Sequence, residues 1–163
     1  MFYSLIKIEI APAMRGLCAK PYPGHPNGCP NYGVKSSCPP RRAHIVEILD
    51  ITRPIYAIWN VFNIGEHAAR LKDKFPAWSD RQLYCCLYWQ PKARKELAEK
   101  IKLFNIAVPG QVIVPIPEAT GVNITETMAN IGERLEWPPR NKAYQVVLAG
   151  TPRPTTGPDD SGK

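Results

Sequence analysis

The chain has 163 residues and a formal net charge of +7, with 21 Lys and Arg against 14 Asp and Glu. A chain of this length fits one domain and buries enough apolar surface to fold without a metal. No apolar run approaches the ~18 residues of a membrane span, and residues 1–10 lack the basic leader and cleavage site of a signal peptide. We therefore expect a soluble, cytoplasmic protein with no membrane segment.

The positive charge favours association with polyanions. Net charge, however, governs association and solubility rather than specific recognition. The sequence has no helix-turn-helix motif, zinc-finger spacing or RNA-binding aromatic motif. Nucleic-acid binding is therefore a second hypothesis, behind a function based on the cysteines described below.

The first third of the chain is dominated by a long loop. Residues 2–10 partly alternate between apolar and polar side chains and predict a strand, which Pro12 ends. Residues 17–42 consist mostly of Pro, Gly and small polar residues, so little apolar surface is available to fix them. Pro39 and Pro40 suit the first turn of a helix that continues to Leu49. That placement would put Cys38 at a helix N-terminus, where the dipole favours a thiolate.

The remainder alternates between strand and helix patterns. Ser79 and Gln82 have the spacing of a capping box and predict the start of a helix that carries Cys85 and Cys86. Another short helix is expected after Asn123 or Thr125 as its cap, with Gly132 just past its end. The other predicted helices are residues 65–75 and 92–104, and the predicted strands are residues 54–62, 111–116 and 143–149.

This alternation predicts an α/β fold, in which strands and helices surround one mostly central sheet in a single domain. The domain is expected to cover residues 1–150, with the cysteine-bearing loop as a metal-binding segment. Residues 151–163 are rich in Pro, Gly and polar side chains, and we expect them to form a disordered tail.

The loop carries Cys18, Cys29 and Cys38, and we expect these three thiols to share a metal site. Five cysteines is an odd number, and clustered thiols in a reducing cytosol favour metal binding over disulfides. Ten and eight residues separate the three cysteines, which matches neither structural zinc pairs nor ferredoxin runs. We favour a [4Fe–4S] cluster, with zinc as the alternative.

Three cysteine ligands leave one position for a further group. The candidates are Cys85, Cys86, a histidine or an exogenous ligand. Adjacent residues on a helix diverge by about 100°, so at most one of Cys85 and Cys86 would join the site. His25 lies inside the loop and is the best-placed histidine; His44 could also reach, whereas His67 is expected to be a surface or packing residue.

The polar residues around the predicted site have simple structural interpretations. Glu118, Asn123 and Thr125 lie near a strand end and a helix start, where we expect them to serve as helix caps rather than ligand contacts. Five basic residues surround the loop; they would offset an anionic cluster, attract a phosphate or form a solvated rim. These residues are Arg15, Lys20, Lys35, Arg41 and Arg42.

No common catalytic motif is present. The sequence lacks a Walker loop, a nucleophile elbow, an HExxH helix and a dinucleotide-binding glycine motif. The four Trp residues have no regular spacing and are expected to pack in the core and at its rim. No reaction, and no catalytic residue, follows from the sequence.

Two stretches together resemble a prokaryotic family of predicted metal-binding proteins, domain of unknown function 2284. The first is Cys-Pro-Asn-Tyr-Gly from Cys29 followed by Cys-Pro-Pro from Cys38, with Cys18 upstream. The second is Pro-Glu-Ala-Thr-Gly-Val-Asn from Pro117, continuing to Leu-Glu-Trp at residues 135–137. The resemblance spans roughly residues 1–150 and implies a metal or iron–sulfur site at the three loop cysteines.

The chain departs from this family in one respect. Family members commonly carry a further ferredoxin-like group of cysteines just before the Pro-Glu-Ala segment, whereas residues 106–117 contain no cysteine. A two-cluster electron carrier is therefore not expected. The resemblance favours Cys86 over Cys85 as a fourth ligand.

The sequence thus predicts a cytoplasmic metal-binding protein with a [4Fe–4S] cluster for redox chemistry or substrate activation. A small molecule or a nucleotide is the expected kind of substrate. The alternative is a zinc-stabilised protein that binds nucleic acid through its basic surface.

Overall fold

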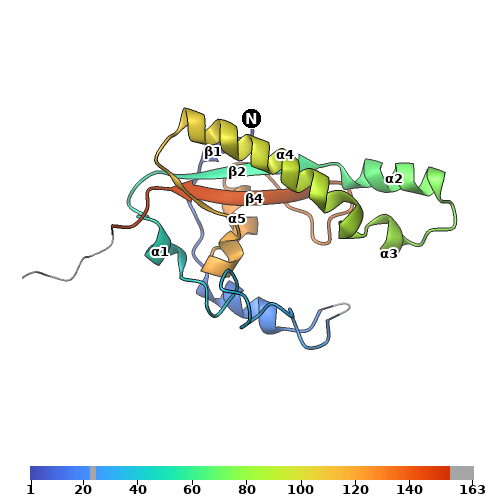
Figure 1. Ribbon diagram of the computed structural model, residues 1–163, viewed down its shortest axis with the longest axis horizontal. Helices are drawn as coiled ribbons and strands as arrows, with labels where there is room; N and C mark the ends of the chain where they lie inside the picture. Colours follow the sequence, from blue (N-terminus) through green and yellow to red (C-terminus); the bar gives the residue numbers. More distant parts are fainter. Residues whose placement is uncertain (23–24, 155–163) are drawn as a thin grey trace, which may run out of the picture.

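The computed structural model describes residues 1–22 and 25–154 and contains one four-stranded antiparallel sheet. The strand order is β1-β2-β4-β3 (Figure 1). The strands are β1 (Tyr3–Leu5), β2 (Ile55–Phe62), β3 (Val112–Val114) and β4 (Ala143–Gly150). The predicted single α/β domain is confirmed, as are the three strands predicted after the loop.

The centre of the sheet is the pairing of β2 with β4 along the full length of both strands. Ile55 lies opposite Gly150 and Phe62 lies opposite Ala143. Side chains alternate between the two faces, since successive strand residues point in opposite directions. Trp59 is buried in the core on one face, and its neighbour Ile58 is buried in the core on the other.

Helix α4 (Cys86–Ala107) lies along one face of the sheet (Figure 1). Phe104 packs from this helix into the core cluster around Ile58. A buried polar contact also joins the two elements. The Asn60 side-chain amide donates to the Ala93 carbonyl at 3.2 Å, and its oxygen accepts from the Lys100 ammonium at 2.6 Å.

Helices α2 (Ile64–Lys74) and α3 (Asp80–Leu83) lie between β2 and α4 in the chain. The predicted capping box of Ser79 and Gln82 is present at the start of α3. The helix predicted to run on through Cys85 and Cys86 is divided, however. α3 ends at Leu83, and Cys85 is the N-cap of α4, with Cys86 as that helix's first residue.

The opposite face of the sheet is covered by α1 (Ile45–Ile48) and α5 (Ile124–Ala129). The 3₁₀ helix η2 (Pro117–Thr120) leads into α5. Asn123 caps α5 as predicted, its side-chain oxygen accepting from the Glu126 amide at 3.3 Å. The apolar residues shared by this face include Ile45, Leu49, Val122, Ile124 and Met128.

The strand predicted over residues 2–10 is only three residues long, because the chain leaves the sheet after Leu5. The Ile6 amide makes a last hydrogen bond to the Ile55 carbonyl at 2.9 Å. Beyond it the chain pairs with the segment between η2 and α5. The Ala11 amide donates to the Gly121 carbonyl at 2.7 Å, and the Asn123 amide donates to the Glu9 carbonyl at 2.8 Å.

Two further predictions need correction. No helix begins at Pro39 and Pro40; α1 begins at Ile45 with His44 as its N-cap, so Cys38 receives no helix-dipole stabilisation. The fold also extends past residue 150, because the Arg153 amide donates to the Ile48 carbonyl at 2.9 Å. The rest of the predicted tail, residues 155–163, lies outside the described residues. Among the helices of the described part, none has both the length and the apolar character to cross a membrane.

The loop before β4 yields a pH prediction. The Glu136 carboxylate accepts hydrogen bonds from the Arg140 and Asn141 amides at 3.1 and 2.9 Å, which lowers its pKa to about 2 from the ordinary 4.5. A lowered folded-state pKa stabilises the fold above the unfolded pKa, and this contribution is lost as the pH falls towards about 2. We expect Glu136→Gln to lower the free energy of unfolding at pH 7, with the difference from the unsubstituted protein shrinking between pH 4.5 and about 2. Urea unfolding across this range measures the difference, and a difference that is independent of pH would contradict it.

Candidate metal centre

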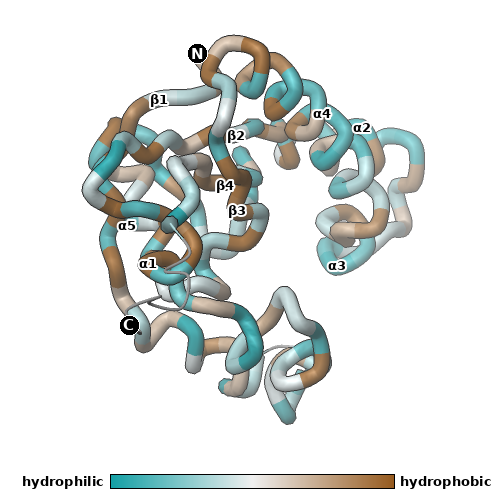
Figure 2. The backbone as a smooth tube through the Cα atoms, turned by 60° about the vertical axis from the view of Figure 1, so that its left-hand side comes forward, coloured by the Kyte–Doolittle hydropathy of each residue, from teal (hydrophilic) through white to brown (hydrophobic). Residues whose placement is uncertain are grey.

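The three loop cysteines line one cavity. It has a volume of about 730 Å³ and lies where the N-terminal loop meets η2 and α5. Cys18, Cys29 and Cys38 all contribute to its wall, together with Glu118 and Tyr22. The rest of the wall is mainly apolar and includes Met14, Leu17, Ile116, Ala119, Ile124 and Trp137. Figure 2 shows the loop as a separate lobe below the sheet.

A close backbone contact positions Cys18 beside Cys29. Cys18 belongs to the 3₁₀ helix η1 (Pro12–Ala19), and its carbonyl accepts from the Cys29 amide at 2.8 Å. Gly28 makes this approach feasible, because a Cβ atom there would lie 2.8 Å from the Cys18 carbonyl oxygen and from the Ala19 carbonyl group. Its φ of +79° also lies in the left-handed region that favours glycine.

A series of turns positions Cys38. The Cys38 amide donates to the Lys35 carbonyl, and the Arg42 amide donates to the Cys38 carbonyl, both at 3.0 Å. The Gly33 amide reaches across to the Pro39 carbonyl at 2.8 Å. Backbone hydrogen bonds therefore hold this part of the loop, in place of the apolar contacts that its composition does not supply.

Arg15 anchors the loop to η1. Its guanidinium donates to the carbonyl oxygens of Pro40 and Arg42, and it contacts Nε2 of His44. His44 also forms the capping box of α1 with Glu47. His44 makes these structural contacts and does not line the cavity. The prediction that it could reach the metal site as a ligand is therefore not supported.

The other two histidines are likewise not among the residues of the cavity wall. The His25 ring lies against Tyr22, with 4.6 Å between the ring centroids. His67 is on α2 and packs edge-on against Phe62, which agrees with the prediction that it is a surface or packing residue. Burial lowers the pKa of His67, because desolvation disfavours the charged imidazolium.

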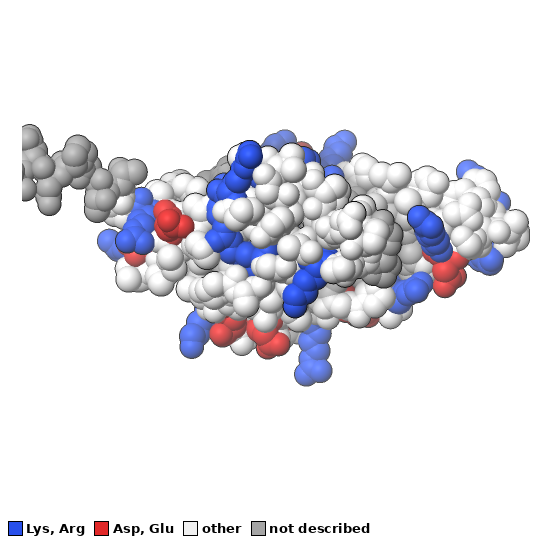
Figure 3. Space-filling view, turned by 90° about the horizontal axis from the view of Figure 1, so that it is seen from below, with Lys and Arg blue, Asp and Glu red and all other residues white. Residues whose placement is uncertain are grey.

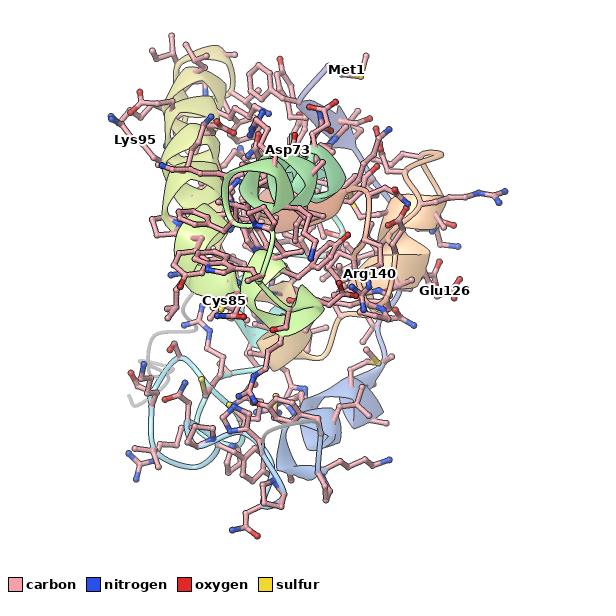
Figure 4. All side chains as sticks on the ribbon, turned by 90° about the vertical axis from the view of Figure 1, so that its right-hand side faces the viewer. Met1, Asp73, Cys85, Lys95, Glu126 and Arg140 are labelled. Carbon is pink, nitrogen blue, oxygen red and sulfur yellow. The ribbon has the colours of Figure 1, made fainter. Side chains whose placement is uncertain are left out.

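Cys85 and Cys86 are likewise absent from the cavity wall. Both lie at the start of α4, where Figure 4 labels Cys85. Cys85 is half-buried and Cys86 is exposed. The prediction of Cys86 as a fourth ligand is therefore not supported by its position.

Glu118 lines the cavity beside the three thiols. The sequence predicted it to be a helix cap, but Asn123 has that role. Burial raises the pKa of the Glu118 carboxyl. Burial is also the main cause of a raised pKa at Cys18, to which the charges of Cys29, Cys38 and Glu118 add. Three thiols and a carboxyl group thus line one cavity.

The side chains surround a cavity and do not converge on one point. Among the described residues, no three His, Cys, Asp or Glu side chains form a group that could hold a metal ion as they lie. A single zinc ion needs all its sulfur ligands at about 2.3 Å. An iron–sulfur cluster places each thiolate on a different iron, so its cysteines stand farther apart.

The loop that carries the three cysteines also has basic side chains at its surface. Lys20, Lys35 and Arg41 are exposed on the loop, and Arg41 also donates to the Val34 carbonyl at 3.1 Å. Seen from below in Figure 3, Lys and Arg side chains lie across the face, and Asp and Glu side chains appear towards its edges. Such a surface favours the approach of anionic molecules.

Comparisons of the chain with protein-family models, with curated proteins and with solved structures gave no match. The resemblance to the predicted metal-binding family thus depends on its short motifs alone and stays a prediction.

The tight contact at Gly28 can be tested against a matched glycine. Gly28 and Gly33 both have positive φ, but only Gly28 has no room for a Cβ atom. We expect Gly28→Ala to separate Cys29 from Cys18 and to increase the alkylation rates of both thiols several-fold. Gly33→Ala should carry only the backbone strain of about 1 kcal/mol and change these rates little. Mass spectrometry of alkylated peptides measures the rates, and equal effects of the two variants would exclude a special role for the Gly28 contact.

Proposed function

We propose that this protein holds an iron–sulfur cluster through Cys18, Cys29 and Cys38. The observation that carries the proposal is that three cysteines separated by ten and eight residues line a single cavity. A cytoplasmic location would keep these thiols reduced and available as ligands. Such a cluster supplies electron transfer or, at an iron without a cysteine ligand, activation of a bound substrate.

The cavity's size and wall favour a cluster over a single zinc ion. A volume of about 730 Å³ has room for a group larger than one ion. The mainly apolar wall would lower the polarity around a cluster, and the polarity of its surroundings is one of the factors that set the potential of a cluster. Trp137 is part of the cavity wall with 68% of its surface exposed, and its Nε1 donates to the Thr125 hydroxyl at 3.0 Å.

The basic loop surface supports an anionic small molecule or a nucleotide as the substrate. Lys20, Lys35 and Arg41 are exposed and would attract phosphate to the loop while the cluster lies within the cavity. A reaction is not assigned, because no catalytic residue stands out beyond the proposed ligands.

The same basic surface favours the second candidate, a zinc-stabilised protein that binds nucleic acid. Such binding would depend on phosphate contacts, and its affinity would fall steeply with salt as counterions are released. An affinity for a single-stranded oligonucleotide that is unchanged between low and moderate salt would exclude this candidate.

Metal analysis of protein purified without oxygen distinguishes the two candidates. We expect iron and acid-labile sulfide in equal amounts, about four of each per chain, and a broad visible absorption that bleaches on reduction. One zinc per chain without sulfide would favour the second candidate and overturn the first.

Single Cys→Ser variants test which thiols hold the cluster. We expect the Cys18, Cys29 and Cys38 variants to lose most of their iron and sulfide, because each thiol contributes to the same cavity. The Cys85 and Cys86 variants are matched controls that should retain both, since neither residue lines the cavity. Iron and sulfide per folded chain are the measurements. Full retention in the Cys29 or Cys38 variant would contradict the proposal.

A further inference from the structure

We infer that the Glu118 carboxylate is the fourth protein ligand of the metal group, beside Cys18, Cys29 and Cys38. The inference rests on the proposed function and extends it, since the three cysteines leave one coordination position without a protein ligand. Both a four-iron cluster and a tetrahedral zinc ion take four protein or solvent ligands, so the same carboxylate would complete either group.

Glu118 is held on a rigid turn that faces the cavity. It is the second residue of η2, in which Pro117, Ala119 and Thr120 are buried. The Thr120 hydroxyl donates to the Pro117 carbonyl at 2.6 Å, and the Gly121 amide donates to the Glu118 carbonyl at 3.1 Å. A fixed backbone of this kind suits a ligand, because little conformational freedom is lost when the metal binds.

The turn is also joined to the element that carries Cys18. The Ala11 amide, directly before η1, donates to the Gly121 carbonyl at 2.7 Å, directly after η2. Gly121 has a φ of +88°, and a Cβ there would lie 3.3 Å from the Pro12 Cα. Glu118 and Cys18 are thus presented to the cavity by two elements in close backbone contact.

The Glu118 carboxylate has no cationic partner in the described part of the chain. The two ion pairs found there join Lys102 to Glu99 and Arg140 to Asp80, both at the surface. Nor does any described side chain donate a hydrogen bond to it; its only hydrogen-bond donor there is its own backbone amide. Half-burying a carboxyl group among apolar side chains with so little compensation is unfavourable. An iron or zinc ion in the cavity would supply the missing partner.

The other candidates for the fourth position are less suitable. Cys85, Cys86 and His25 do not line the cavity. Tyr22 does, but it is 44% exposed, and its phenol must lose a proton that is held far more tightly than a carboxyl proton. Among the described non-cysteine residues of the wall, Glu118 is therefore the best metal ligand.

Substitutions of Glu118 test the inference in protein reconstituted with iron and sulfide without oxygen. Glu118→Ala and Glu118→Gln remove the carboxylate, and Glu118→Cys replaces it with a thiolate. Glu126→Gln is the matched control, because Glu126 is an exposed carboxylate that points outward from α5 (Figure 4). Circular dichroism and thermal unfolding establish that each variant is folded.

We expect the Ala and Gln variants to lose one iron on mild oxidation, giving about three irons per four sulfides and the electron paramagnetic resonance signal of a three-iron cluster. The Cys variant should keep all four irons under the same treatment. An added small thiol should alter the spectrum of the reduced Ala variant, whose fourth iron is open, and leave that of the unsubstituted protein unchanged. The Glu126 variant should behave like the unsubstituted protein.

The outcomes separate this inference from the proposal beneath it. An unsubstituted protein that takes up no cluster and binds no zinc would overturn the proposed function. A protein that binds a cluster, but whose Glu118 variants match it in iron retention and in response to added thiol, would overturn only the inference about Glu118. A fourth iron that already responds to thiol in the unsubstituted protein would have an exogenous ligand, which also excludes Glu118. If zinc is bound instead, a Glu118→Ala variant with unchanged zinc affinity would exclude it as a ligand.

Discussion

The candidate site depends on a short backbone pairing between residues 9–11 and 121–123. Ile10 forms an isolated bridge with Val122, and the flanking amides of Ala11 and Asn123 donate to carbonyls across the pair. The buried Thr127 hydroxyl accepts from the Glu9 amide at 2.9 Å and extends the contact into α5. This pairing places η1 against η2. It therefore brings Cys18 of η1 and Glu118 of η2, which are far apart in the sequence, to the same cavity. Because Val122, Ile124 and Met128 belong to the buried core on the same side of the sheet, the site is built on the core's edge.

Hydrogen bonds hold the loop in place, whereas the burial of apolar side chains stabilises the rest of the fold. Arg15 donates to two loop carbonyls at once. A segment rich in proline has few backbone amides of its own to do so, because proline lacks the N–H group. The turns around Cys29 and Cys38 add backbone hydrogen bonds. These interactions fix the path of the backbone, but they leave the cavity between the thiols open. A loop of this kind is ordered by its hydrogen bonds, and a ligand bound inside it would stabilise it further.

The parts of the fold that were predictable are those in which local pattern and tertiary packing agree. The apolar run of β2 and the capping box of Ser79 and Gln82 needed no knowledge of distant partners. The errors arise where a distant partner decides. Pro40 resembles a helix start, yet its carbonyl accepts from Arg15 instead of from a helical amide. Glu118 resembles a cap in sequence, and only the pairing of residues 9–11 with 121–123 shows that it faces Cys18 across a cavity. The three cysteines were identifiable from their loop composition, whereas their shared cavity required the fold.

Two of the acidic groups in the cavity are difficult to ionise. Burial raises the pKa of Glu118, and burial together with the charges of Cys29, Cys38 and Glu118 raises the pKa of Cys18. A chain that needed only a stable loop would have no use for four acidic groups in such a place, since apolar residues of similar size would avoid the desolvation. Arg15 does not neutralise them, because its contacts are with loop carbonyls and His44. The metal ion or cluster that we propose would resolve the conflict: it would replace the protons on the thiols and the carboxyl group, and it would supply the positive charge that this apolar wall lacks.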